Sequence, residues 1–337
     1  MHPEASMRVL VTGGAGYVGA VSVDALLAAG DDVVVLDDLS TGHRSAVPDG
    51  VRLETVSFGD EAAVTALLTS ARIDAILHCA ARSLVAESVR EPSRYYRANV
   101  AGGIALLEAA RQAGVGRIVF SSTAAVYGVP DSTPIEEYAP LRPINTYGET
   151  KRTFEAAMAA YGIAYGLHSV SLRYFNVAGA TERLGEVHDP ETHLIPNVLT
   201  AAEGHGGPLM LFGEDYPTPD GTCVRDYIHV SDLADAHLLA LEATAPGDER
   251  TAQALVCNLG SGGGFSVREV LRAAESVVGR PIPHTIGPRR AGDPPILVAS
   301  ATRAESVLGW RARHSSLEEM IGSAWEWRQR HPTGYGD

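Results

Sequence analysis

The chain has 337 residues, of which 45% are hydrophobic and 20% charged, a composition typical of a globular protein large enough for two lobes around a sizeable core. Acidic residues outnumber basic ones by 41 to 27, which gives a net charge of −14 without a basic stripe and argues against a nucleic-acid-binding protein. No apolar run reaches the roughly 18–20 residues of a membrane span, so we expect no membrane association.

The chain begins with a short extension, residues 1–6, which lacks the basic and apolar regions of a secretory signal, and Met7 is an alternative start. Apolar runs at 8–12, 32–36, 51–56, 75–79, 117–122 and 167–174 predict strands, and amphipathic runs at 17–29, 61–69 and 96–112 predict helices between them. Near-continuous apolar strands separated by helices are typical of a parallel sheet covered on both faces. We therefore predict an α/β fold with a doubly wound parallel (Rossmann) sheet.

The pattern changes after Asn176. A stretch rich in Gly, His, Asp and Pro at 179–208 predicts a loop, and mixed short strands and helices follow up to Trp325 and Trp327. We predict a first domain at 1–178 and a smaller mixed α/β lobe at 179–337, with segments such as 225–245 returning to the first domain. Because no flexible linker or low-complexity tract separates them, the two lobes are expected to share a cleft.

The first predicted strand runs into a glycine turn. Gly14, Gly16 and Gly19 satisfy G-x-G-x-x-G, and Gly13 starts an overlapping variant. Glycines at these positions let the backbone approach a pyrophosphate at the N-terminus of the next helix. Asp37 ends the second strand 18 residues after Gly19, where its carboxylate can accept both adenosine-ribose hydroxyls and would repel a 2′-phosphate. This favours NAD over NADP; the alternative is a plain glycine turn and a surface aspartate.

Lys151 is the only lysine among the 27 basic residues, either by coding bias or because arginine cannot replace it. Tyr147 lies four positions earlier, so both side chains share one face of a helix. A nearby ammonium favours a phenolate, and Tyr147 is expected to act as a base well below its free pKa of about 10. Thr123, at the end of the fifth strand, adds a hydroxyl at the ligand crevice. The group is suited to taking a proton from an alcohol, with hydride transfer to NAD.

With these motifs together, the chain resembles the extended short-chain dehydrogenase/reductase family, and within it the UDP-galactose 4-epimerase branch. The similarity extends from about Arg8 to the C-terminus. It is clearest at residues 9–19, 36–39, 78–89 (HCAARSLVAESV), 120–128 (FSSTAAVYG), 147–151, 172–176 (LRYFN), 213–230 and 288–293 (PRRAGD). One departure is Ser83, where some members place a lysine on the cofactor.

The resemblance implies a set of site residues. The catalytic ones would be Tyr147 as the base, Lys151 on the nicotinamide ribose, and Thr123 in the proton network. The implied NAD contacts are Gly13, Gly16, Tyr17, Val18, Gly19, Asp37, Asp60, Asn99, Lys151 and Tyr174. The implied UDP-sugar contacts are Thr123, Tyr147, Asn176, Leu194, Arg225, Tyr227, Arg290 and Asp293. Arg225 and Arg290 can bind a diphosphate bidentately; for Arg290 and its neighbour Arg289 the alternative is a solvated basic pair.

The resemblance also implies a reaction, the NAD-dependent inversion of carbon 4 of a UDP-hexose through a transient 4-keto sugar. Related dehydratases and decarboxylases carry acidic residues after the catalytic hydroxyl, but this chain has Ala124 and Ala125, which cannot transfer protons. Two different functions stay open: a dehydrogenase that releases a ketosugar, and an inactive sensor of NAD or a nucleotide sugar. Leu297, of intermediate size, would wall the sugar pocket, so glucose/galactose is expected ahead of N-acetylhexosamine, pentose or uronate substrates.

Three further expectations concern assembly, metals and location. The resemblance implies a homodimer through helices at 92–112 and 147–161, where Ala156, Ala157, Ala159 and Ala160 either permit close helix approach or pack on the chain's own sheet. The 12 histidines show neither H-E-x-x-H nor Cys/His spacing, so we expect no metal site. Cys79, Cys223 and Cys257 are widely spaced, which predicts reduced thiols in a cytoplasmic protein.

Overall fold

The computed structural model describes residues 6–205, 207–251, 254–290 and 293–336. Met1, one of the two candidate start residues, and residues 291–292 of the stretch 288–293 lie outside these ranges. The strands are β1 (Arg8–Thr12), β2 (Asp32–Leu36), β3 (Arg52–Glu54), β4 (Ala75–His78), β5 (Arg117–Thr123), β6 (His168–Tyr174), β7 (Asn176–Ala178), β8 (Leu209–Phe212), β9 (Val224–Arg225), β10 (Tyr227–His229), β11 (Leu255–Leu259), β12 (Phe265–Ser266), β13 (His284–Gly287) and β14 (Ile296–Leu297).

The helices complete the set of elements. They are α1 (Tyr17–Ala29), α2 (Glu61–Ser70), α3 (Val85–Arg90), α4 (Pro92–Tyr95), α5 (Gly103–Ala113), α6 (Thr146–Tyr165), α7 (Leu194–Ala202), α8 (Val230–Ala243), α9 (Val267–Val278), α10 (Thr302–Leu308) and α11 (Leu317–Arg330). A π-helical segment, η2 (Tyr96–Gly102), precedes α5, and short 3₁₀ turns are η1 (Arg44–Ala46), η3 (Ala124–Val126) and η4 (Glu249–Thr251).

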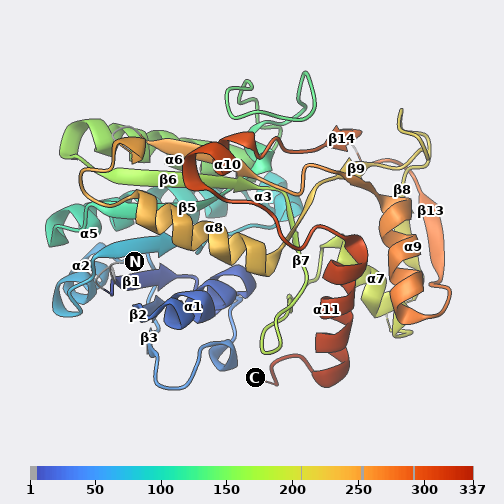
Figure 1. Cartoon of the computed structure of the whole chain (residues 1–337), viewed down its shortest axis with the longest axis horizontal. Coiled ribbons are helices and arrows are strands. Elements are labelled where there is room, and N and C mark those ends of the chain that lie inside the picture. The colour runs from blue at the N-terminus through green and yellow to red at the C-terminus, as the bar shows by residue number, and fades with distance from the viewer. Residues whose placement is uncertain (1–5, 206, 252–253, 291–292, 337) are drawn as a thin grey trace.

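The central layer is a seven-stranded sheet in the order β11-β6-β5-β4-β1-β2-β3, in which every neighbouring pair is parallel (Figure 1). Its inner strands are buried on both faces because helices cover both sides, and all four residues of β4 are buried. One core packs α1, α8 and α10 on one face of the sheet, and a second packs α2, α5 and α6 on the other. The predicted doubly wound α/β fold is confirmed.

A second group of elements lies beside the sheet, on the right of Figure 1, and includes α7, α9, α11, β8 and β13. Helices α7, α9 and α11 and strand β8 share their own hydrophobic core, and β13 pairs with β8 at its edge. The prediction of a continuous loop at 179–208 is wrong, because α7 begins at Leu194. Its sequence LIPNVLTAA buries Ile195, Val198, Leu199 and Ala202 at helical spacing, and Pro196 is tolerated in the first turn.

Two elements from the second half of the chain belong to the first layer. Helix α8 packs on α1 in the sheet core, and β11 pairs with β6 at the edge of the sheet. The chain therefore crosses between the two groups more than once. Residues that line one cleft between the groups can in this way come from either half of the chain.

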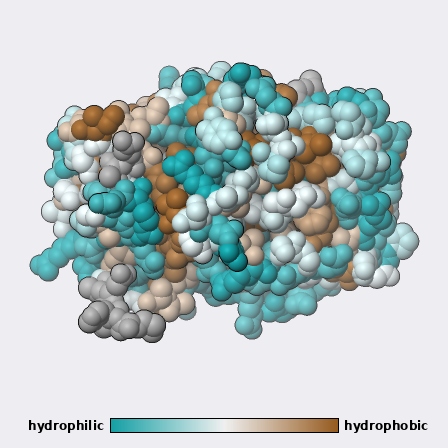
Figure 2. Space-filling model, turned by 45° about the horizontal axis from the view of Figure 1, so that its top comes forward, coloured by the Kyte–Doolittle hydropathy of each residue, from teal (hydrophilic) through white to brown (hydrophobic). Residues whose placement is uncertain are grey.

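The surface and helix lengths give two further observations. Within the described ranges, no helix is long and apolar enough to cross a membrane. The face shown in Figure 2 is mostly hydrophilic, and its hydrophobic side chains gather in separate patches.

Candidate active site

A cleft of about 2020 Å³ opens at the carboxyl ends of β1, β2, β4, β5 and β6 and extends onto α7, β8 and β9 of the second group. This is the edge at which open parallel sheets bind ligands. The cleft wall includes the predicted site residues Gly13, Gly16, Tyr17, Val18, Gly19, Asp37, Asp60, Thr123, Tyr147, Lys151, Tyr174, Asn176, Leu194, Arg225, Tyr227, Arg290 and Asp293. Leu297 lines it as well, whereas Asn99 does not.

The glycine turn joins β1 to α1 and needs its glycines for steric reasons. Gly13 has a φ of +72°, in the left-handed region that side chains disfavour. A Cβ on Gly19 would lie 2.0 Å from the carbonyl oxygen of Gly13. Gly16 is the N-cap of α1, and among the described residues no side chain caps this helix end and no acidic residue lies in its first turn. The first amides of α1 are therefore available to an anion such as a pyrophosphate.

Two of the predicted cofactor carboxylates differ in what they already bind. Asp37 is 9% exposed, accepts hydrogen bonds from the amides of Ala15 (3.0 Å) and Leu39 (2.9 Å), and keeps lone pairs for ribose hydroxyls; burial raises its pKa. Asp60 is the N-cap of α2 and accepts from the amide of Ala63 at 3.1 Å. Asp60 therefore has a structural role as well as its place in the cleft wall.

Asn99 lies behind the cleft wall, where its side chain is fully hydrogen-bonded to neighbouring residues. Its side-chain oxygen accepts from the amide of Arg82 at 2.9 Å, and its side-chain nitrogen donates to the Arg82 carbonyl (3.0 Å) and the Thr150 hydroxyl (3.1 Å). Asn99 thus fixes the backbone of the cleft wall from behind. Its direct contact with a cofactor stays a prediction.

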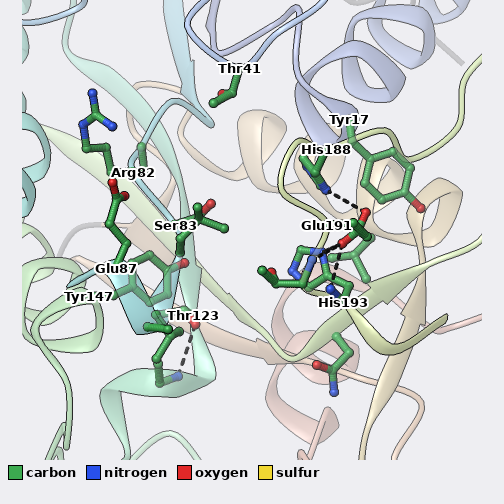
Figure 3. A pocket seen from close by; sticks show the side chains of 18 of the residues that line it. Tyr17, Thr41, Arg82, Ser83, Glu87, Thr123, Tyr147, His188, Glu191 and His193 are labelled. Carbon is green, nitrogen blue, oxygen red and sulfur yellow. Dashed lines mark hydrogen bonds and ion pairs between the residues drawn. The ribbon is translucent and has the colours of Figure 1, made fainter. Parts of the chain in front are cut away.

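Tyr147, Lys151 and Thr123 meet where β5 ends against the first turn of α6. The side chain of Asn145 caps α6 by accepting from the amide of Gly148 at 2.8 Å, which places Tyr147 in the first turn. Nζ of Lys151 donates to the Ser121 carbonyl at 2.8 Å and lies 5.8 Å from the centre of the Tyr147 ring. The predicted constellation is therefore assembled, with phenol and hydroxyl on one wall of the cleft (Figure 3).

The electrostatics of this group differ from the prediction. Burial raises the pKa of Tyr147 to about 12, and the hydrogen bond with Thr123 offsets only part of this effect. Burial also lowers the pKa of Lys151 to about 8. The expectation that Lys151 brings the Tyr147 phenol well below its free pKa is wrong in this structure, because desolvation of the phenolate outweighs an ammonium bound to a carbonyl.

The lowered pKa of Lys151 predicts that this catalytic candidate lowers the stability of the folded protein. Its ordinary value is 10.5 and its folded value about 8, so between these pH values the unfolded chain holds more protons, and below pH 8 the folded chain bears the full cost of a buried ammonium. On protein stripped of bound nucleotide, Lys151→Met is expected to raise the free energy of unfolding at pH 7 by up to about 3 kcal/mol, and the gain fades as the pH rises from 8 to 10.5. Urea unfolding at pH 7, 9 and 10.5 measures it; a variant less stable than wild type at pH 7 contradicts it.

The second wall of the cleft carries the predicted substrate residues. Arg225 forms an ion pair with Asp293 and donates to the Val224 carbonyl at 2.7 Å. The Arg290 guanidinium lies 4.1 Å from the centre of the Phe212 ring, so this residue is held by a cation–π contact. Asn176 donates to the Asp226 carbonyl at 3.0 Å. The two arginines supply local positive charge in a chain with a net charge of −14.

The sequence analysis missed a cluster of two glutamates and two histidines in the same cleft. Glu186, His188, Glu191 and His193 precede α7 on the segment predicted as a loop. Burial lowers the pKa of each histidine, but the two carboxylates outweigh it and raise the pKa to about 9 for His188 and about 10 for His193. In the sequence this cluster has the spacing E-x-H-x-x-E-x-H, which matches neither H-E-x-x-H nor the Cys/His spacing of zinc sites.

The fold and the cleft together define a dinucleotide-binding α/β protein with a tyrosine–lysine pair placed for proton transfer. Open helix amides at the glycine turn fit a pyrophosphate, and the free lone pairs of Asp37 fit a ribose diol. The chain belongs to the NAD dependent epimerase/dehydratase family, which matches residues 9–258.

Individual relatives are similar over almost the full length. The UDP-glucose 4-epimerase of Streptomyces lividans is 50% identical over 333 residues, which cover 98% of this chain and 99% of the relative. Among solved structures, the UDP-glucose 4-epimerase of Brucella ovis in complex with NAD is 44% identical with a TM-score of 0.91, covering 96% of this chain and 98% of that one. The enzyme of Bifidobacterium longum in complex with NAD⁺ and UDP is 36% identical with a TM-score of 0.91, covering 97% and 99%.

Proposed function

We propose that this protein is an NAD-dependent enzyme that inverts carbon 4 of a UDP-hexose and interconverts UDP-galactose and UDP-glucose. The observation that supports this most strongly is that Tyr147, Lys151 and Thr123 share one cleft with the glycine turn and with Arg225 and Arg290. Relatives with this activity in their names are about half identical to the chain from end to end. The glycine turn, Asp37 and Lys151 would hold NAD, and the two arginines a diphosphate.

In the mechanism, Tyr147 takes the proton of the sugar 4-hydroxyl and Thr123 hydrogen-bonds the phenol. NAD, when bound, supplies the acceptance and return of hydride at carbon 4. Lys151 stabilises the phenolate as the proton leaves. Arg225 and Arg290 hold the substrate by its diphosphate, so the 4-keto sugar is free to turn and present its other face. Tyr147 then returns the proton, and the cofactor ends each turnover in its starting state.

The competing functions have less support from the cleft. Ala124 and Ala125 follow the catalytic hydroxyl and line the cleft where elimination at carbons 5 and 6 would need an acid and a base. A pure sensor has no need for Tyr147 and Lys151 in the wall of the cleft. Leu297 pairs with Arg225 across β14 and β9 and borders the cleft, and a side chain of this size favours hexoses over the bulkier N-acetylhexosamines.

The test is a discontinuous assay with UDP-galactose and no added NAD, in which quenched samples are separated by chromatography. We expect UDP-glucose to form until equilibrium, with no accumulation of reduced cofactor. Formation of NADH and a ketosugar would instead identify a dehydrogenase. If the protein holds NAD but turns over no UDP-sugar, the sensor function replaces this proposal.

We further propose that the protein is a cytoplasmic homodimer, with the domain division at residue 178 as predicted. The free thiols of Cys79, Cys223 and Cys257 support a reducing compartment. The proposed interface helices include α6 and η2. Ala156 and Ala160 are exposed on α6, and Tyr96 on η2 is 43% exposed. These residues are therefore not buried in the chain's own core.

Light scattering coupled to gel filtration tests the assembly. We expect wild-type protein to elute with the mass of two chains and the double variant Ala156→Arg/Ala160→Arg with the mass of one, because two buried guanidinium groups would oppose close helix packing. Ala28→Arg, at an exposed alanine of α1 on the other face of the sheet, is the matched control and should stay dimeric. A monomeric wild type contradicts the proposal.

A further inference from the structure

The cluster on the segment between β7 and α7 is not used by the proposed mechanism. Its members are Glu186, His188, Glu191 and His193, and one candidate ligand atom from each lies within 4.8 Å of all the others. Figure 3 shows His188, Glu191 and His193 pointing toward one another beside Tyr17, across the cleft from Tyr147. The four side chains therefore converge on a point, as the ligands of a metal ion do.

The spacing of the atoms agrees with metal ligation. Nδ1 of His188 lies 3.2 Å from Oε1 of Glu186 and 3.5 Å from Oε2 of Glu191, and Nδ1 of His193 lies 3.4 Å from Oε1 of Glu191. In a tetrahedral zinc site with bonds of about 2.0–2.2 Å, neighbouring ligand atoms are about 3.3–3.6 Å apart, so Glu191 would turn to present one oxygen to the ion. The fourth histidine–carboxylate pair, His193 and Glu186, is closer at 2.6 Å. Its two atoms would have to move apart by less than about 1 Å to bind the same ion.

The hydrogen-bond geometry gives an independent observation. Nδ1 of His188 is buried and makes no hydrogen bond, although two carboxylates lie beside it. A histidine held there only by its carboxylates would be expected to aim its N–H at one of them. Instead the nitrogen lies within 3.5 Å of both carboxylates and hydrogen-bonds neither, which fits a lone pair that takes part in binding a shared ion.

We propose that Glu186, His188, Glu191 and His193 bind one Zn²⁺ ion. Two imidazole nitrogens and two carboxylate oxygens are a donor set that zinc accepts in tetrahedral geometry. Because four protein ligands fill such a site, the ion is structural and has no open position for catalysis. The site is distinct from Tyr147 and Thr123, which lie on the opposite wall.

The ion would fix the segment that forms one wall of the cleft. His193 immediately precedes Leu194, the first residue of α7 and a proposed substrate contact. The same segment starts at Gly179, whose carbonyl accepts from the Tyr17 hydroxyl at 2.5 Å on the first turn of α1. A bound ion would take the place of the two histidine protons that face Glu186 and Glu191, so the segment would stay in place while its imidazoles are neutral.

The test uses full-length protein without a polyhistidine tag, stripped with a chelator and then titrated with Zn²⁺ by calorimetry. We expect one ion per chain with a dissociation constant below about 1 μM. Loss of a group that only hydrogen-bonds a zinc ligand costs about 10–100-fold in affinity, so loss of the ligand itself in His188→Ala is expected to cost at least about 100-fold. His284→Ala, at an exposed histidine of β13 outside the cluster, should bind like wild type.

A second readout does not depend on the variants. Co²⁺ should substitute for zinc in wild-type protein and give the intense visible absorption of a tetrahedral complex, and an anomalous difference map at the zinc edge should show a peak among the four side chains. The proposal is overturned if His188→Ala still binds zinc tightly, or if wild-type protein binds no zinc at micromolar concentration. It is also overturned if Co²⁺ in wild-type protein gives the weak spectrum of an octahedral complex. If His188→Ala fails to fold, the cobalt spectrum and the map decide.

Discussion

Tyr147→Phe is expected to lower kcat for UDP-galactose by about 10²–10⁴-fold, the usual contribution of one general acid–base group. The phenyl ring can keep the position of the phenol in the first turn of α6, but it cannot accept the proton of the sugar hydroxyl. Because the pKa of Tyr147 is about 12, the phenolate fraction of wild type rises with pH. The wild-type rate should therefore climb toward alkaline pH until Lys151 loses its proton, and the variant rate should not.

The matched control for this variant is Tyr138→Phe, because the side chain of Tyr138 is 84% exposed. It should keep the wild-type kcat. In both variants KM and the amount of bound NAD should stay close to wild type, since the lost hydroxyl acts on the reacting proton. If Tyr147→Phe retains more than a tenth of the wild-type kcat, the assignment of the base is wrong.

The sheet and the glycine turn could be predicted because local sequence and tertiary environment agree there. Strands β1 and β2 and helix α1 have the predicted bounds, since the apolar run of β1 ends at the glycine turn, α1 starts at Tyr17 directly after it, and the apolar run of β2 ends before Asp37. The cleft could be predicted for the same reason, as the carboxyl ends of parallel strands meet at one edge. Residues placed there by the sheet, such as Thr123 and Tyr174, lie where the sequence analysis expects them.

The parts that could not be predicted depend on contacts between distant segments. The composition of residues 179–208 predicts a loop. The last part of this segment nevertheless forms helix α7, because its apolar side chains pack in a core with α9 and α11. The resemblance implies that Asn99 contacts the cofactor, but its sequence position does not show that its amide is hydrogen-bonded to Arg82 and Thr150. The pKa of Tyr147 depends on how deeply the phenol is buried, and the spacing between Tyr147 and Lys151 gives no information on burial.

A buried ion pair behind the site was also missed, because its partners are far apart in the sequence. The guanidinium of Arg173 donates to both carboxylate oxygens of Glu155, at 3.0 and 2.5 Å, and the Ser122 hydroxyl donates to the same carboxylate at 2.5 Å. The side chains of the pair are 4% and 7% exposed. Glu155 lies one turn after Lys151, and Ser122 precedes Thr123, so this network joins the elements that carry the catalytic group.

Glu155→Gln is expected to lower the free energy of unfolding by about 3–5 kcal/mol, because it leaves the Arg173 charge buried without its carboxylate. Glu149→Gln is the matched control on the same helix: Glu149 also pairs with an arginine, Arg152, but the two side chains are 31% and 44% exposed, and the loss should stay below about 1 kcal/mol. Urea unfolding at pH 7 measures both. The Glu155 carboxylate also helps to raise the pKa of Lys151, so its removal should weaken the ammonium beside Tyr147. Equal losses in the two variants would mean that Arg173 finds other compensation, and that the pair does not hold the site together.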